Sequence, residues 1–299
     1  MHISFRDKLI SVKPFVLDDA TVETMEPQYL ERAQRNAEAI EAIDFEYVVN
    51  GRKYNGFYAR LKSLDKNVKH PVVILNRGGT ALFGRIDAKQ IFLGFATSSI
   101  NAGYIVIGSQ CMGFAEDGAP DEFCGTDFES VLALKDLIDA DDMADASRIG
   151  VYGGSRGAIA TFRLLAEVNW IKAAVVISGA LDLFDDDFRD MTENYVKTFG
   201  GSKEEREKRS VLCWPEKLPK NVPILLMYGT SDWRVNPRTS LRLSEKFLDL
   251  KIPHRLVMFE GSDHFLSENM QESKPMGSAW LDRFVRNDGA LPDMEPHGN

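Results

Sequence analysis

Short apolar runs alternate along the chain with segments whose apolar residues recur at helical spacing. The runs expected to form strands lie at 71–76, 104–109, 149–154, 173–178, 223–229 and 254–259. The segments expected to form helices lie at 88–100, 126–138, 239–250 and 276–286, with a further helix after residue 157. Near-continuous apolar strands that alternate with helices are typical of a parallel sheet covered on both faces. The pattern therefore predicts an α/β fold with a mostly parallel central sheet.

The pattern differs before residue 71. Residues 21–43 have helical periodicity, with Glu26-Pro27 as a first turn, and predict a helix across the edge of the domain. Residues 45–61 predict a hairpin, because alternating apolar residues flank the turn signal Asn50-Gly51.

We therefore divide the chain into three parts. Residues 1–44 form an N-terminal helical extension, residues 45–286 form one α/β domain, and residues 287–299 form a flexible tail rich in Gly, Pro and Asp. Within the domain, the charged segment 181–220 is too short for a core of its own but could form a small helical cap.

Residues Arg148–Gly157 read RIGVYGGSRG and place Ser155 in the pattern G-x-S-x-G. An apolar strand precedes this pattern and a helical segment follows it. Such a turn would expose the Ser155 hydroxyl as a nucleophile, with the helix N-terminus directed at developing negative charge. A structural glycine-rich turn is the alternative, but the strand–turn–helix setting favours a nucleophile elbow.

Two later strands are also followed by polar residues. Asp232 comes after the strand 223–229, and His264 comes after the strand 254–259. Ligands of parallel sheets bind outside the carboxyl ends of the strands, and the chain order Ser155, Asp232, His264 is found in serine hydrolases. We expect Ser155 to be the nucleophile and His264 the general base and acid, with Asp232 orienting the imidazole.

Other acidic residues compete with Asp232 for this role. Asp182 and the run Asp185–Asp187 follow an earlier strand, and Asp263 adjoins the histidine. Acidic runs usually form a solvated surface, and Asp263 is too close in sequence to orient the ring of its neighbour easily. Order and position favour Asp232.

An oxyanion hole needs two preorganised N–H donors. The backbone N–H of Arg156, directly after the nucleophile, is expected to supply one. The second is expected from the loop Asn76–Thr80, where Gly79 is preferred and Gly78 or Thr80 are alternatives. A glycine turn needed only for a tight bend is the structural alternative.

Composition and charge exclude several other functions. The net charge of −9 argues against nucleic-acid binding. The N-terminus has scattered charges and no apolar signal sequence, and no apolar stretch approaches membrane-spanning length, so no membrane association is expected. Cys111, Cys124 and Cys213 cannot all pair, which favours reduced thiols and a cytoplasmic location. No Cys or His lies at metal-ligand spacing, so neither a metal nor a cofactor is expected.

Five segments together resemble the α/β-hydrolases, and more narrowly the catalytic domain of the prolyl oligopeptidase (S9) group. They are VVILNRGGT, DEFCGTDFESVLALKDLI, YGGSRG, YGTSDWRV and GSDHF, and the resemblance covers residues 45–286. The resemblance implies an α/β-hydrolase fold with the Ser-Asp-His triad. Within the group, the chain is similar to small bacterial dipeptidyl- or acylaminoacyl-peptidase-like hydrolases. No residues before 45 could build the β-propeller of the group's peptidases, and the paired glutamates that hold a substrate amine have no counterpart. The resemblance therefore supports the fold and triad more than peptide cleavage.

These observations predict a serine hydrolase that cleaves an ester or amide of a small substrate through an acyl-enzyme, in the manner of a carboxylesterase. An S9-type exopeptidase acting on short peptides is the closest alternative. A non-catalytic binding protein, an acyltransferase and a lyase are also compatible with the fold. The oligomeric state is left open.

Arg156 has two interpretations. It could clamp a substrate carboxylate, or it could pair with Glu122, Asp127 or another local carboxylate, which is favoured because buried arginines normally have partners. The substrate pocket is expected near Cys111–Phe114 and the segment 181–220, whose apolar candidates are Leu183, Phe184, Phe188, Tyr195, Phe199 and Trp214.

Overall fold

The computed structural model describes residues 4–23, 25–94, 96–184 and 198–298. Within these residues, nine strands form one sheet in the order β1-β2-β3-β5-β4-β6-β7-β8-β9. The strands are β1 Ser11–Pro14, β2 Ile40–Val49, β3 Arg52–Leu61, β4 His70–Asn76, β5 Ile105–Ser109, β6 Ala144–Gly154, β7 Ile171–Ile177, β8 Ile224–Gly229 and β9 His254–Phe259. The strands from β4 to β9 are parallel to one another, whereas β1, β2 and β3 pair antiparallel. The predicted α/β fold with a mostly parallel sheet is confirmed.

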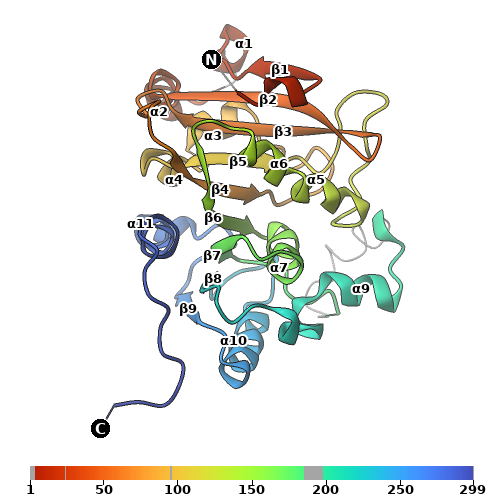
Figure 1. Cartoon of the computed structure of the whole chain (residues 1–299), viewed down its shortest axis with the longest axis vertical. Coiled ribbons are helices and arrows are strands. Elements are labelled where there is room, and N and C mark those ends of the chain that lie inside the picture. The colour runs from red at the N-terminus through yellow and green to blue at the C-terminus, as the bar shows by residue number, and fades with distance from the viewer. Residues whose placement is uncertain (1–3, 24, 95, 185–197, 299) are drawn as a thin grey trace.

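Helices cover both faces of this sheet (Figure 1). They are α1 Asp19–Glu23, α2 Pro27–Ala39, α3 Ala88–Leu93, α4 Thr97–Asn101, α5 Glu129–Leu132, α6 Leu134–Asp139, α7 Gly157–Glu167, α9 Lys203–Arg209, α10 Arg238–Leu250 and α11 Met270–Leu281. Shorter helical turns are η1 Arg6–Lys8, η2 Thr126–Phe128, η4 Val211–Cys213, η5 Pro215–Lys217, η6 Ser267–Asn269 and the π-helical η7 Asp282–Arg286. None of the helices in the described ranges has the length and apolar content needed to span a bilayer.

Two apolar cores follow from this arrangement. The first joins one sheet face to α6, α7 and α10 through residues such as Leu134, Phe162 and Phe247. The second joins the opposite face to α2, α3, α4 and α11 through residues such as Ile91 and Trp280. The alternating strands and helices of the sequence thus produce a sheet that is buried on both sides.

The hairpin predicted at 45–61 is confirmed, with Val49 opposite Arg52 across the turn. Asn50 and Gly51 both have positive φ, 49° and 77°, as a tight hairpin turn requires. The helix predicted to reach Ile43 is wrong beyond Ala39, because β2 begins at Ile40 and pairs along its length with β3. The cross-strand contacts of Ile40 and Ile43 outweigh their helical spacing. Residues 1–44 consequently contribute β1 and the start of β2 to the sheet.

Smaller differences occur further along the chain. The predicted helix 88–100 is divided into α3 and α4 at Gly94, whose φ of 117° ends α3. The helix predicted at 276–286 begins earlier, at Met270, and continues past Pro275. In the segment 181–220, α9, η4 and η5 are helical, and residues 185–197 lie outside the described ranges. Whether this segment forms a cap stays a prediction.

Candidate active site

Ser155 lies in the turn between β6 and α7. Its φ is +54°, in the left-handed region that costs an L-residue roughly 1–2 kcal/mol. The turn is held by the Ser155 N–H, which donates to the carbonyl of Ile177 at 2.9 Å. A Cβ on Gly157 would lie only 2.1 Å from the carbonyl oxygen of Asn76, so the backbone of β4 approaches too closely for any other residue. The local sequence therefore produces the strained strand–turn–helix geometry of a nucleophile elbow.

Asp232 and His264 meet beyond the ends of the neighbouring strands β8 and β9. His264 Nδ1 lies 2.8 Å from Asp232 Oδ2, and the two side chains are 3% and 0% exposed. Asp232 Oδ1 also accepts the N–H groups of Arg234 and Val235, at 2.8 and 3.0 Å. The carboxylate is thereby fixed before it engages the ring. With Nδ1 donating to Asp232, Nε2 is the ring nitrogen able to take a proton.

The competing acids have other contacts. Asp182 lies 3.7 Å from Arg242 and accepts the N–H of Phe184. Asp263 accepts the N–H groups of Phe265 and Ser267, both at 2.9 Å, and so stabilises its own loop. Residues Asp185–Asp187 lie outside the described ranges.

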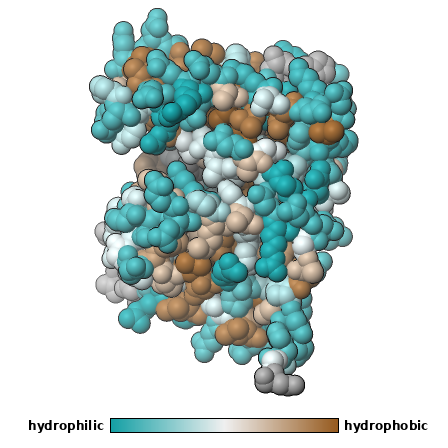
Figure 2. All heavy atoms as spheres, turned by 90° about the vertical axis from the view of Figure 1, so that its left-hand side faces the viewer, coloured by the Kyte–Doolittle hydropathy of each residue, from teal (hydrophilic) through white to brown (hydrophobic). Residues whose placement is uncertain are grey.

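Ser155 and His264 line one cavity of about 430 Å³. This volume falls in the range of about 300–1,000 Å³ found for small-molecule sites. Its apolar lining includes Val73, Leu75, Val106, Tyr152 and Ile177 from the sheet, Leu93 from α3, Met270 from α11, and Ala96 and Phe265. Figure 2 faces this side of the molecule, where the surface is hollowed between two mostly hydrophilic regions.

The described residues of the pocket predicted near Cys111 and in the segment 181–220 do not line the cavity that contains Ser155. Cys111, Leu183 and Trp214 are buried in the core on the opposite face of the sheet, and Phe199 stacks on Phe123. Phe184 does not line the cavity, and Phe188 and Tyr195 lie outside the described residues. Phe199 and Trp214 line a second cavity, of about 1210 Å³, which contains neither Ser155 nor His264. Apolar content alone did not identify which cavity the candidate nucleophile lines.

The loop after β4 passes directly beside the elbow. A Cβ on Gly78 would lie 3.3 Å from the Cβ of Ser155. Gly79 has φ +72°, and its carbonyl accepts a hydrogen bond from Arg156 Nη1 at 2.9 Å. The loop that carries Gly79 is thus tied to the residue after Ser155. This contact fits the expected pair of oxyanion donors, whose role stays a proposal.

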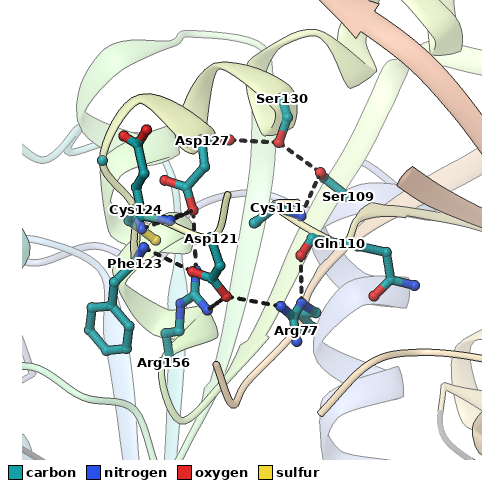
Figure 3. Close-up of polar contacts among 12 residues, drawn as sticks. Arg77, Ser109, Gln110, Cys111, Asp121, Phe123, Cys124, Asp127, Ser130 and Arg156 are labelled. Atoms are coloured by element: carbon teal, nitrogen blue, oxygen red, sulfur yellow. Dashed lines mark hydrogen bonds and ion pairs between the residues drawn. The ribbon is translucent and has the colours of Figure 1, made fainter. Parts of the chain in front are cut away.

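The Arg156 side chain is buried among carboxylates (Figure 3). Its guanidinium lies 2.6 Å from Asp121 and 3.3 Å from Asp127, and Asp121 also pairs with Arg77 at 3.1 Å. The preferred interpretation of Arg156, a structural pair that includes Asp127, is confirmed. Glu122 instead pairs with Arg52.

Two cations and two carboxylates therefore balance within this cluster. Burial would raise the pKa of Asp121, but the Arg156 charge and the hydrogen bonds to Asp121 lower it below its ordinary value. Burial raises the pKa of Asp127 despite the attraction of Arg156. Burial also raises the pKa of the Cys111 and Cys124 thiols, to about 12 and about 11. All three cysteines are free, and no group of metal-binding side chains occurs among the described residues.

Sequence reasoning missed several residues of the site. Arg77 lies in the NRGG motif and Asp121 lies in the DEF motif. Their positions within these motifs could have identified them as residues of the site. Two basic residues of the cavity, Arg32 and Lys274, come from helices that only the fold brings together. A single sequence gave no signal for this pair.

Comparisons with known proteins show which family this chain resembles. The family model of the prolyl oligopeptidase family matches residues 97–287. A Bacillus subtilis (strain 168) protein named "Putative esterase YitV" is 27% identical over 242 residues, which cover 72% of this chain and 89% of that protein.

Solved structures share the fold at lower identity. One is an acylaminoacyl peptidase in complex with Z-Gly-Gly-Phe-chloromethyl ketone, with a TM-score of 0.69 and 18% identity over 86% of this chain. Another is a puromycin-hydrolyzing peptidase of Mycobacterium tuberculosis, with a TM-score of 0.64 and 22% identity over 79% of this chain. The chain spans 43% and 38% of the lengths of these two proteins. The family match covers more than half of the chain, which therefore belongs to the prolyl oligopeptidase family of α/β-hydrolases and is a serine hydrolase.

Proposed function

We propose that this hydrolase is a carboxylesterase-like enzyme that cleaves small esters, with Ser155 as nucleophile, His264 as base and Asp232 as the orienting acid. Ser155 Oγ attacks the ester carbonyl carbon while His264 Nε2 takes the hydroxyl proton. The tetrahedral intermediate collapses, the C–O bond to the alcohol breaks, and His264 returns the proton to the leaving alcohol. Water then attacks the acyl-enzyme with His264 again as base, which releases the acid and restores Ser155.

The proposed oxyanion donors are the backbone N–H groups of Gly79 and Arg156. Charge on the carbonyl oxygen grows in both tetrahedral intermediates, so fixed donors stabilise the transition states more than the ground state. The Arg156 side chain supports this arrangement, because it binds the Gly79 carbonyl and both acidic residues of its cluster at once. Its role is to position the loop and the elbow.

One observation favours esters over peptides with a free N-terminus. No Asp or Glu occurs among the described residues that line the cavity. A peptide ammonium would therefore lose hydration without gaining an ionic partner, which is costly. The similarity to a protein named as a putative esterase supports the same choice.

The exopeptidase alternative keeps support from the family name and from solved peptidases of similar fold. One of these proteins is named an acylaminoacyl peptidase, a name that denotes substrates with an acylated N-terminus. Such a substrate has no N-terminal ammonium, so its binding would not bury an unpaired charge in the cavity. This alternative needs the same Ser155, Asp232 and His264.

A matched substrate panel separates the two functions. We would compare kcat/KM for p-nitrophenyl acetate, butyrate and hexanoate with Ala-Ala-p-nitroanilide and N-acetyl-Ala-p-nitroanilide at one pH, with Ser155→Ala as the blank. We expect every ester to exceed both anilides, since p-nitrophenolate leaves more readily than p-nitroaniline. An anilide that exceeds the esters would replace the esterase proposal by a peptidase, of the acylaminoacyl type if only the acetylated anilide is cleaved.

We also infer a cytoplasmic location from the free cysteines, and a catalytic domain that ends at residue 286 and is followed by a tail at 287–299. The predicted boundary between an extension at 1–44 and the domain at 45–286 falls inside β2, so β1 and β2 belong to the domain. Limited proteolysis tests the division into parts. Cleavage is expected after residue 286 before any cut within 45–286.

A further inference from the structure

Two basic side chains from distant parts of the chain line the cavity that contains Ser155. Arg32 comes from α2 and Lys274 from α11. Both are exposed along part of their length. Within the described residues, neither forms an ion pair or a side-chain hydrogen bond, and the cavity lining contains no carboxylate.

The two cations also influence each other. Partial burial, and then the charge of Arg32, lower the pKa of Lys274 below its ordinary value. The ammonium is therefore less stable in the empty cavity than in water. An anion between the two side chains would offset their mutual repulsion and stabilise the charged form of Lys274, since it supplies an opposite charge. Arginine and lysine together are well suited to bind a carboxylate.

The rest of the lining specifies the other end of the ligand. Val73, Leu75 and Val106 present an apolar wall from the sheet, and Leu93 and Met270 add to it from the helical side. Ser155 and His264 line the same cavity at the carboxyl ends of the strands. A ligand that fills the cavity would thus place an apolar chain on the wall, an anionic group at Arg32 and Lys274, and a reacting carbonyl at Ser155.

We propose that the preferred acyl group of this enzyme is an apolar chain that ends in a carboxylate, bound by Arg32 and Lys274 while its ester carbonyl lies at Ser155. The proposal rests on the proposed function and names its substrate class, the half-esters of dicarboxylic acids. The acyl group remains in the site through both acylation and deacylation, so an anchor for it acts in both steps. The segment matched by the family model begins at residue 97 and therefore does not include Arg32, so the family match alone does not imply this pair of cations.

The test compares two esters with the same leaving group and the same chain length, mono-p-nitrophenyl adipate and p-nitrophenyl hexanoate. The methyl ester of the adipate compound serves as an uncharged analogue of the same shape. The variant Arg32→Gln/Lys274→Gln removes both cations. The control Arg35→Gln/Lys246→Gln removes the same charge from exposed residues of α2 and α10 that do not line the cavity.

The ratio of kcat/KM for the adipate ester to kcat/KM for the hexanoate ester should fall about 10-fold or more in Arg32→Gln/Lys274→Gln, the cavity variant, because the charge-assisted contacts are lost. The same ratio should be unchanged in the control. Added salt should raise KM for the adipate ester in the wild type and leave KM for the methyl analogue unchanged, because only the former binds through partly exposed charges. An equal ratio in all three proteins would overturn the proposal while leaving esterase activity established.

A second measurement does not require turnover. Free adipate should slow fluorophosphonate labelling of the wild type and the control, but not of the cavity variant, and inorganic phosphate at the same ionic strength should protect less. Equal protection of all three proteins would overturn the proposal. Stronger protection by phosphate than by adipate would also overturn it and would indicate a phosphorylated ligand instead. If the protein is neither labelled nor able to cleave any ester, the proposed function is contradicted instead. A direct measurement of adipate binding to the wild type and the cavity variant would then still test whether Arg32 and Lys274 bind a carboxylate.

Discussion

Arg156 Nη1 lies 2.6 Å from Asp121 Oδ2, and this contact fixes the residue after the proposed nucleophile to a carboxylate that comes 35 positions earlier in the chain. Both side chains are buried. The same Arg156 atom donates to the Gly79 carbonyl, so one guanidinium connects the elbow, the oxyanion loop and the acidic motif. We expect this cluster to contribute to stability and to catalysis.

Removal of the Asp121 charge should destabilise the protein. Asp121→Asn leaves Arg77 and Arg156 with too little negative charge, and breaking a buried pair costs on the order of 3–5 kcal/mol. Denaturant unfolding monitored by fluorescence measures the loss. Asp117→Asn, which removes an exposed partner of Lys53, is the control and should change little. Equal effects of the two substitutions would contradict a structural role for the cluster.

The same pair predicts a pH dependence. The pKa of Asp121 is lowered in the folded protein, so its ionised form adds stability above its unfolded pKa, and this stability is lost as the pH falls through the folded pKa. The difference in unfolding free energy between wild type and Asp121→Asn should therefore shrink from pH 7 towards pH 3. A constant difference over this range would show that the charge of Asp121 is not its cause.

Asp232→Asn should retain the fold but lower kcat on the order of 10³–10⁴-fold, because the amide favours the wrong tautomer of His264. Asp182→Asn is the matched control, since Asp182 contacts Arg242 and not the imidazole. Steady-state kinetics on one p-nitrophenyl ester measures both variants. If Asp182→Asn is the more damaging change, the acid of the triad has been assigned to the wrong strand.

Glycines at the elbow should differ in their tolerance of alanine. A Cβ at Gly157 would lie 2.1 Å from the Asn76 carbonyl, whereas a Cβ at Gly154 would have its nearest neighbour at 3.7 Å. Gly157→Ala should lower Tm by several degrees or prevent folding, as overpacking costs about 1–3 kcal/mol or more, and Gly154→Ala should leave Tm nearly unchanged. Equal Tm values for the two variants would contradict the close approach of β4 to the elbow.

The sequence was most informative where local chemistry decides the structure. Asn50-Gly51 specified the hairpin, and the apolar runs specified the central strands, because these features depend on neighbours in sequence. The spacing of Ile40 and Ile43 predicts a helix, and only pairing with β3 makes these residues part of a strand. In the site, too, residues that only tertiary packing brings together could not be predicted from the sequence. Asp232 and His264 follow strands and could be identified from their order, whereas Arg32 and Lys274 line one cavity only because of how α2 and α11 pack on the sheet.

The nucleophile can be identified from the position of covalent modification by a fluorophosphonate, measured by peptide mapping and mass spectrometry. We predict one adduct, on the peptide that contains Ser155, together with loss of ester hydrolysis in proportion to labelling. Ser155→Ala should abolish the adduct and lower kcat by about 10⁴-fold or more while the fold is kept. An adduct on another serine, or full hydrolysis by Ser155→Ala, would show that Ser155 is not the nucleophile.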